Sequence, residues 1–153
     1  MTSGPMEHLH TLQRSPFALA PVIHQFYDSA APRERDLLLS YLVLPMVLYP
    51  SMQKFLLGAN VKSSLRTLCQ EQSRLVGLVH NTHRFKALTH GALLVLRAER
   101  SIEVTDRLAV KSVGQVRSVN AVEKQLRAAH RLAVIFGEAD IVTIYRMLGF
   151  KSL

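Results

Sequence analysis

Hydrophobic residues recur with helical spacing over most of this chain, and the first such stretch begins at Ser15. Its apolar face is defined by residues that lie three or four positions apart: Phe17, Ala20, Ile23 and Tyr27. The Ser15 hydroxyl can accept a free backbone N–H at a helix start, and Pro16 is tolerated at the first helical position. The pattern therefore predicts a helix that starts at Ser15–Pro16 and ends within residues 28–32.

The longest apolar stretch of the sequence lies between residues 36 and 53 and contains two prolines. Pro45 lacks an N–H and clashes with the preceding helical turn, which predicts that a helix over residues 33–43 ends or kinks just before it. Pro50 fits the first turn of another short helix, and Gly58 is expected to close that helix. These helices are apolar on nearly every side, so we expect them to be covered on nearly every side.

Further helices and a hairpin are predicted after residue 60. Amphipathic helical patterns cover residues 62–69, 75–80, 85–97, 118–136 and 138–148. Asn81–Thr82 is interpreted as a break, and Gly137 and Gly149 as helix ends. The longest pattern has apolar residues spaced alternately by three and four positions: Val119, Val122, Leu126, Ala129, Ala133 and Phe136. Apolar and polar residues alternate over 102–104 and 108–110, which predicts a two-stranded hairpin.

The predicted fold class is mainly α: a compact helical domain with one small β-hairpin. A helical unit followed by a hairpin is also compatible with a winged helix-turn-helix, which remains the alternative. Residues 1–14 have no helical period and are predicted to form a flexible leader, followed by a single helical domain over residues 15–153. The length of 153 residues and the hydrophobic content of 48% suit one globular domain.

The apolar stretch over residues 37–49 is too short to cross a membrane, because a spanning helix needs about 20 apolar residues and Pro45 interrupts this one. The N-terminal residues lack the pattern of a secretory signal. A single cysteine, Cys69, excludes an intrachain disulfide and favours a reducing compartment. We therefore predict a cytoplasmic protein that does not associate with membranes.

The net charge of +8 falls entirely within residues 61–153, because basic and acidic residues are equal in number over residues 1–60. Three of the bases, Lys124, Arg127 and Arg131, lie at positions i, i+3 and i+7 of the longest predicted helix. Such a basic face can bind DNA phosphates or an acidic partner protein. A solvated surface is the simpler alternative.

Candidate catalytic and metal-binding residues lack the spacing that such sites need. The candidate metal ligands are His8, His10, His80, His83, His90 and Cys69. They show neither the two tight ligand pairs of a zinc site nor the spacing of a zinc protease. The sequence also contains no nucleophile elbow and no glycine-rich phosphate loop. We therefore predict a chain that is not an enzyme, with no catalytic residue, metal, cofactor or small-molecule substrate.

Three segments of the chain together resemble a known family. In order along the sequence they are SPFALAPVIHQFY, LSYLVLPMVLYPSMQKFL and AAHRLAVIFGEADIVTIYRMLGFK. The positions that match lie at residues 41–45, 47–48, 50, 144–145 and 148–149. On these motifs the chain resembles the middle component of three-component ABC systems, prokaryotic conflict loci that include Lamassu-type antiphage defence. It departs from the family pattern at Tyr49, Gln53 and Lys151–Ser152.

The resemblance implies a small, non-enzymatic adaptor between an SMC/ABC-type ATPase subunit, which senses DNA, and an effector subunit, often a nuclease. The adaptor would hold the effector inactive until foreign DNA is detected, and it would meet DNA through the complex.

Under this interpretation the partner-binding residues are Tyr41, Leu44, Pro45, Leu48, Tyr49 and Tyr145. Lys124, Arg127 and Arg131 would contact DNA or an acidic partner. Two alternatives stay open: an apolar stretch that is core throughout, and a stand-alone basic helical regulator that binds nucleic acid.

Overall fold

The computed structural model describes residues 15–119 and 121–151, so the predicted leader, residues 1–14, lies outside the described part of the chain. The described residues are mainly helical and include one small antiparallel hairpin, which confirms the predicted fold class. In chain order the elements are α2 (Pro16–Asp28), η1 (Asp36–Leu39), α3 (Ser40–Val47), α4 (Pro50–Leu57), α5 (Leu65–Cys69), α6 (Gln72–Leu75), α7 (Leu78–Arg84), α8 (Lys86–Ala98), β1 (Ile102–Val104), β2 (Val110–Ser112), α9 (Glu123–Phe136) and α10 (Ile141–Met147).

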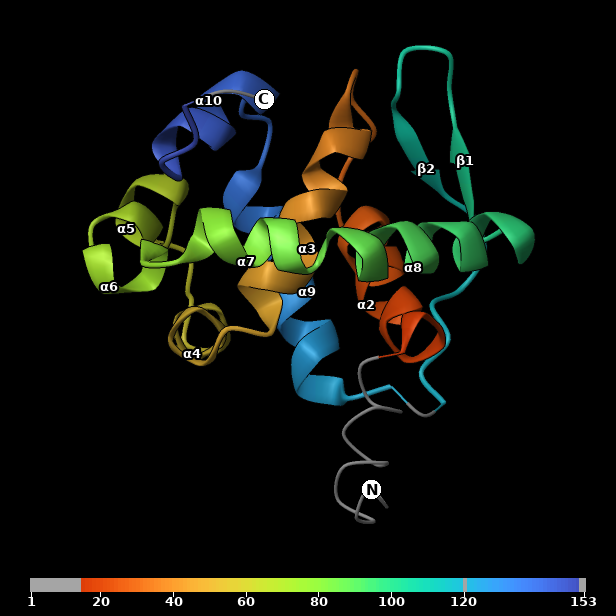
Figure 1. Ribbon diagram of the computed structural model, residues 1–153, viewed down its shortest axis with the longest axis horizontal. Coiled ribbons are helices and arrows are strands. Elements are labelled where there is room, and N and C mark those ends of the chain that lie inside the picture. Colours follow the sequence, from red (N-terminus) through yellow and green to blue (C-terminus); the bar gives the residue numbers. More distant parts are fainter. Residues whose placement is uncertain (1–14, 120, 152–153) are drawn as a thin grey trace.

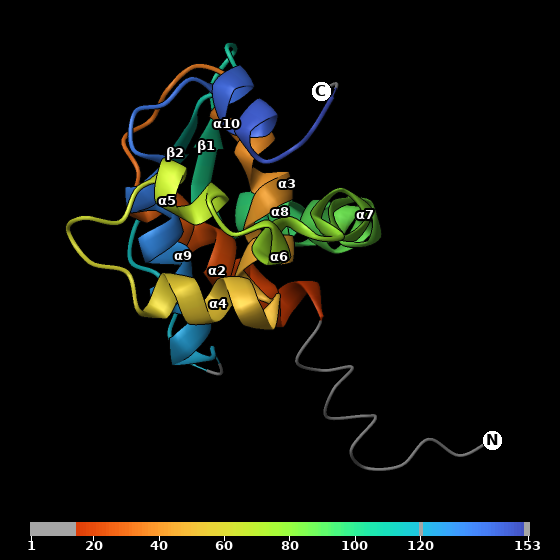
Figure 2. The ribbon, with the colours of Figure 1, turned by 90° about the vertical axis from the view of Figure 1, so that its left-hand side faces the viewer.

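Helix α2 is the centre of the molecule and lies between α8 on one side and α9 on the other (Figures 1 and 2). It begins as predicted, because the Ser15 hydroxyl accepts the Ala18 N–H at 3.1 Å and Pro16 occupies the first turn. Phe26 lies edge-on to Phe136 of α9, with 6.0 Å between the ring centroids. This aromatic contact joins the two helices within a cluster of buried apolar side chains.

One residue of the predicted apolar face of α2 is not in the core. Ala20, Ile23 and Tyr27 are buried, but the Phe17 side chain is 75% exposed. Phe17 lies in the first turn of α2, at a surface hollow that Val119 also lines, and the described chain does not cover it there. The helical period was therefore correct, but the buried face begins one turn later.

The contact between α2 and α8 depends on a glycine. A Cβ atom added to Gly91 of α8 would lie 2.7 Å from Pro16 Cγ, well inside van der Waals contact. The missing side chain therefore allows α8 to approach the first turn of α2 closely.

Helix α3 is covered on nearly every side, as predicted: Tyr41 is half-buried and the other residues of the helix are buried. The helix does not end just before Pro45, so this one of the two predicted outcomes, an end or a kink, is wrong. The chain enters through η1, and α3 then continues through Pro45 to Val47. A proline inside a helix costs about 3 kcal/mol. Burial of this very apolar helix against α2, α4, α8 and α9 offsets that cost.

The hairpin is fixed to the start of η1 by a buried carboxylate. Asp36 accepts the Val110 N–H at 2.6 Å and the Arg33 N–H at 3.0 Å. Two backbone hydrogen bonds continue the contact, from Arg35 N–H to the Arg107 carbonyl and from Leu37 N–H to the Leu108 carbonyl, both at 2.9 Å. Residues 33–37 and the tip of the hairpin therefore form one hydrogen-bonded unit.

Strand β1 lies where it was predicted, but β2 begins two residues later than expected. Leu108 has a φ of 62°, in the left-handed region, and is therefore part of the turn. The pairing joins Ile102 to Ser112 and Val104 to Val110. Strand β2 thus extends two residues beyond its predicted end at residue 110.

Between residues 75 and 82 the helical boundaries differ from the predictions in two places. The pattern expected over residues 75–80 is broken at Gly77, whose φ of 75° places it in the left-handed region between α6 and α7. Asn81–Thr82 was expected to end a helix but lies inside α7, where the Thr82 hydroxyl donates to the Leu78 carbonyl at 2.9 Å. This hydrogen bond gives the Thr82 hydroxyl a partner within α7, so the helix does not have to end there.

Helix α9 begins at Glu123, five residues after the predicted start, so Val119 lies before the helix and is exposed. Its predicted end at Gly137 is confirmed, as are the bounds of α4. Helix α10 ends as expected at Gly149, whose φ is 97°. There the Gly149 N–H bonds to the Arg146 carbonyl and the Phe150 N–H to the Tyr145 carbonyl, which is the Schellman arrangement.

Candidate functional site

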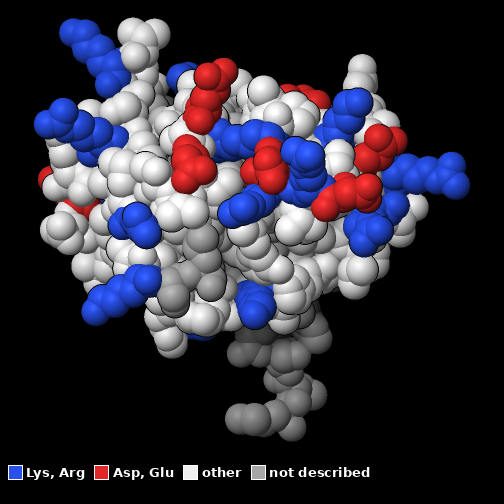
Figure 3. All heavy atoms as spheres, turned by 90° about the horizontal axis from the view of Figure 1, so that it is seen from above, with Lys and Arg blue, Asp and Glu red and all other residues white. Residues whose placement is uncertain are grey.

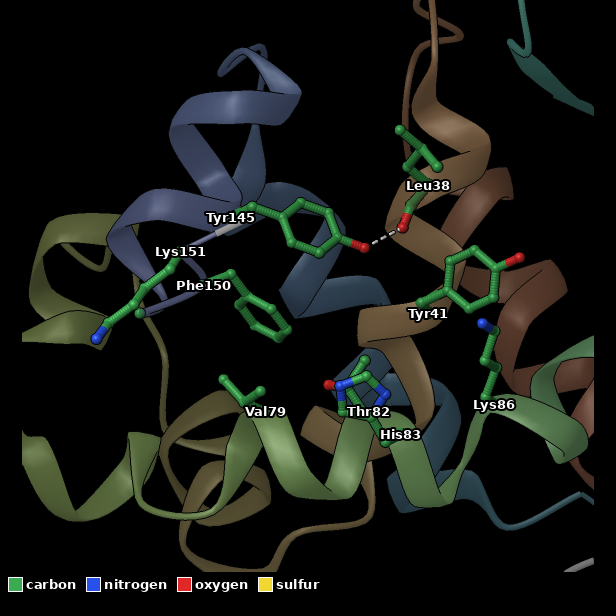
Figure 4. A pocket seen from close by; sticks show the side chains of 10 residues that line it. Leu38, Tyr41, Val79, Thr82, His83, Lys86, Tyr145, Phe150 and Lys151 are labelled. Atoms are coloured by element: carbon green, nitrogen blue, oxygen red, sulfur yellow. Dashed lines mark hydrogen bonds between the residues drawn. The ribbon is translucent and has the colours of Figure 1, made fainter. Parts of the chain in front are cut away.

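A pocket of about 640 Å³ opens between α3, α7 and the end of α10 (Figure 4). Its apolar side chains come from three separate parts of the sequence: Leu38, Tyr41, Val79, Tyr145 and Phe150. The Tyr145 and Phe150 rings lie edge-to-face with centroids 5.0 Å apart. A volume of this size, with mostly apolar walls, is typical of a binding pocket.

The hydroxyl groups in the pocket already have partners within the chain. Tyr145 donates to the Leu38 carbonyl, and Thr82 donates to the Leu78 carbonyl. The Tyr41 hydroxyl lies 2.9 Å from His90 Nε2. Burial, together with the nearby Tyr41, raises the pKa of Tyr145, so its hydroxyl stays protonated as a donor at neutral pH. The floor therefore offers apolar surface and few free hydrogen-bonding groups.

The charged residues that line the pocket are basic. Lys86 comes from the start of α8 and Lys151 follows α10, and the close view places them on opposite sides of the pocket. Both are exposed, and neither forms an ion pair with another described residue. Asp and Glu are absent from the lining, so the rim is electropositive.

The six predicted partner-binding residues separate into three groups. Tyr41 and Tyr145 line the pocket just described. Pro45, Leu48 and Tyr49 line a neighbouring hollow of about 150 Å³ together with part of α7. Leu44 is fully buried in the core, so its side chain has no surface to offer a partner in this structure.

The predicted basic residues lie on one exposed side of α9. Lys124, Arg127 and Arg131 are exposed, whereas the neighbouring Ala128 and Leu132 are buried. No ion pair links these three bases to other described residues. Elsewhere the charges are mixed: on the face seen in Figure 3, acidic side chains are interspersed among the basic ones. The α9 face is thus a local cationic feature.

The sequence pattern did not indicate Leu38, Val79, Lys86 and Phe150 as site residues. They lie far apart in the chain, and the pocket exists only because α7 packs against α3 while the end of α10 turns toward both. The one available signal was Phe150–Lys151, an aromatic and a basic residue placed directly after the predicted helix end at Gly149.

The described residues give no support for two other kinds of site. Within residues 15–119 and 121–151, no group of three or more His, Cys, Asp and Glu side chains is arranged to hold a metal ion. Among the helices of that part, none is long and apolar enough to span a bilayer. His8 and His10 lie outside the described residues.

These features define a small helical protein whose candidate sites are an apolar surface pocket and a basic helix face. Its family is given by a match over residues 3–152 to the model of the ABC-three component (ABC-3C) system Middle Component 3, and the chain belongs to that family. The resemblance noted in the sequence is thereby confirmed. A comparison with curated proteins and one with solved structures each gave no match. A middle component is one part of a multi-component ABC system, so partner subunits are implied.

Proposed function

We propose that this protein is a non-catalytic adaptor that bridges an SMC/ABC-type ATPase subunit and a nuclease-type effector subunit in a cytoplasmic antiphage or anti-plasmid complex. The ATPase would detect foreign DNA, and the adaptor would restrain the effector until that signal arrives. DNA would be met mainly through the complex.

The observation that carries this proposal is the family match, which extends over nearly the whole chain. The structure adds two features that suit a bridging subunit. One is the pocket that contains Tyr41 and Tyr145, and the other is the exposed basic side of α9. They come from different elements, which suits a subunit that contacts two partners.

The proposal is tested by co-expressing the chain with the products of its flanking genes and capturing one of them by a tag. We expect the ATPase and the effector to be recovered together when this chain is present, and separately when its gene is left out. Recovery of ATPase and effector together without this chain would contradict bridging. Failure of the chain to join either partner would contradict the adaptor role.

The exposed bases of α9 favour one second candidate, a stand-alone basic helical regulator that binds nucleic acid. Such a protein would bind DNA by itself, with an affinity that falls steeply as salt rises because phosphate contacts release counterions. Binding of the isolated chain that is weak and insensitive to salt would remove this candidate.

A further inference from the structure

The pocket between α3, α7 and α10 combines an apolar floor with lysines on opposite sides (Figure 4). We propose that it receives a short acidic segment of a partner protein, with one bulky apolar side chain in the pocket and carboxylates beside Lys86 and Lys151. The identity of that partner as another subunit of the complex rests on the proposed function. The chemistry of the segment rests on the pocket alone.

The floor selects an apolar side chain. The Tyr145 and Thr82 hydroxyls donate to carbonyls of the chain itself, so a polar group in the pocket would lose its water without gaining these donors. Val79 is 40% exposed at the opening, so apolar surface is in contact with water in the free protein. Covering this surface is favourable, and an aromatic or large aliphatic side chain covers it best.

The rim selects negative charge beside that apolar side chain. Lys86 and Lys151 are exposed, unpaired among the described residues, and not opposed by any acidic lining residue. A segment with carboxylates on both sides of its apolar residue would meet both cations at once. Rim charges of this kind mainly guide association and exclude basic partners.

The first experiment compares variants in the co-expressed complex. Val79→Glu and Lys86→Glu change an exposed wall residue and a rim cation. Val61→Glu and Lys62→Glu are the matched controls, because both residues are exposed in the loop before α5, away from the pocket. We expect the pocket variants to bind the partner subunit at least about tenfold more weakly and the controls to bind normally. If the wild-type chain forms the complex and the pocket variants bind the partner subunit as strongly as the wild type does, the pocket proposal is overturned. The adaptor role would still stand.

The second experiment needs no partner subunit. The isotope-labelled full chain is titrated with the peptide Glu-Glu-Phe-Glu-Glu, which carries a single bulky apolar side chain, and followed by amide NMR. We expect shifts in residues 79–86 and 145–151, and their loss when Phe is replaced by Ala or the Glu residues by Gln. Amide spectra of the protein variants from the first experiment also report whether each of them is folded.

Each outcome of the peptide titration decides the proposal. Shifts confined to the pocket support it, even if no complex forms and the adaptor role fails. It is overturned if no shifts occur, if shifts occur elsewhere, or if a short single-stranded oligonucleotide shifts the pocket equally well.

Discussion

Two buried polar side chains, His24 and Asp36, connect the helical core to the hairpin. His24 Nε2 lies 3.0 Å from the Ser112 hydroxyl, which donates to Asp28 at 2.9 Å. Asp36 accepts two backbone N–H groups, one of them from β2. Burial raises the pKa of Asp36, and its hydrogen bonds and Arg33 oppose that effect. These residues hold the hairpin through hydrogen bonds. Removing either side chain would leave buried donors or acceptors without partners, which lowers the free energy of unfolding.

The environment of His24 predicts a pH dependence of stability. Burial lowers the pKa of His24 below 6.5, although the charges of Asp28 and Glu99 oppose the shift. Between this lowered pKa and 6.5 the unfolded chain binds a proton that the folded chain does not bind. The free energy of unfolding therefore contains a contribution that is lost as pH falls through this window.

The measurement is denaturant unfolding at pH about 7.5 and about 5.5. His24→Gln should show a smaller loss of stability between these pH values than the wild type. The matched control His80→Gln, at an exposed position of α7, should behave as the wild type. An equal pH dependence in all three proteins would show that His24 does not contribute.

Leu44 supplies a second prediction at this scale. Its side chain is fully buried, so Leu44→Asp places an unpaired charge in the core. The cost of several kcal/mol is comparable with the total stability of about 5–15 kcal/mol of a small domain. We expect the variant to be insoluble or unfolded by circular dichroism. The control Leu94→Asp, at a position that is 67% exposed, should fold. A stable Leu44→Asp protein would mean that this side chain is accessible.

At the scale of elements, the sequence predicted helices well where their ends carry a local signal. The start of α2 was predicted from Ser15–Pro16, and both ends of α4 were predicted from Pro50 and Gly58. These signals are reliable because helix capping depends only on neighbouring residues. The helix continues past Pro45, where an end or a kink was predicted, because tertiary burial of α3 outweighs the local cost of the proline. The start of α9 was missed because Val119 and Val122 continue the apolar period although the chain there is not helical.

The contact between α8 and the first turn of α2 can be tested through Gly91. Alanine usually stabilises a helix by about 0.5–1 kcal/mol over glycine, whereas overpacking a tight contact costs about 1–3 kcal/mol. Because the proline ring at position 16 cannot rotate away, we expect Gly91→Ala to destabilise the protein by about 1 kcal/mol. Gly58→Ala is the control, since a Cβ there meets its nearest atom at 3.5 Å. Thermal melts that rise equally for both variants would contradict the close contact.

On the scale of the whole molecule, the pocket and the basic side of α9 are separate surfaces of a helical protein built around α2. The pocket could not be assembled from sequence. The pocket joins residues 38–41, 79–86 and 145–151, and only the packing of α3, α7 and α10 brings these together. The spacing of the three bases on α9 did predict their shared exposure, because they lie within a single helix.

The basic side of α9 predicts how the assembled complex responds to charge reversal. In the triple variant Lys124→Glu, Arg127→Glu and Arg131→Glu, we expect weaker engagement of DNA or of an acidic partner. If phosphates are contacted, the slope of log affinity against log salt should fall by about 0.9 for each lost contact. A control triple variant that reverses Lys62, Arg66 and Arg97, which are also exposed, should bind normally. Equal binding by both triple variants would show that the basic side of α9 is a solvated surface with no role in binding.

The hydrogen bonds between residues 33–37 and the hairpin tip also limit how related chains can be recombined. A hairpin transplanted from another family member would have to bring its own version of residues 33–37, since Asp36, Arg35 and Leu37 bond directly to its backbone. Leu38 of the pocket follows immediately in the chain. Exchanging the hairpin alone should therefore disturb a binding surface to which the hairpin contributes no residue.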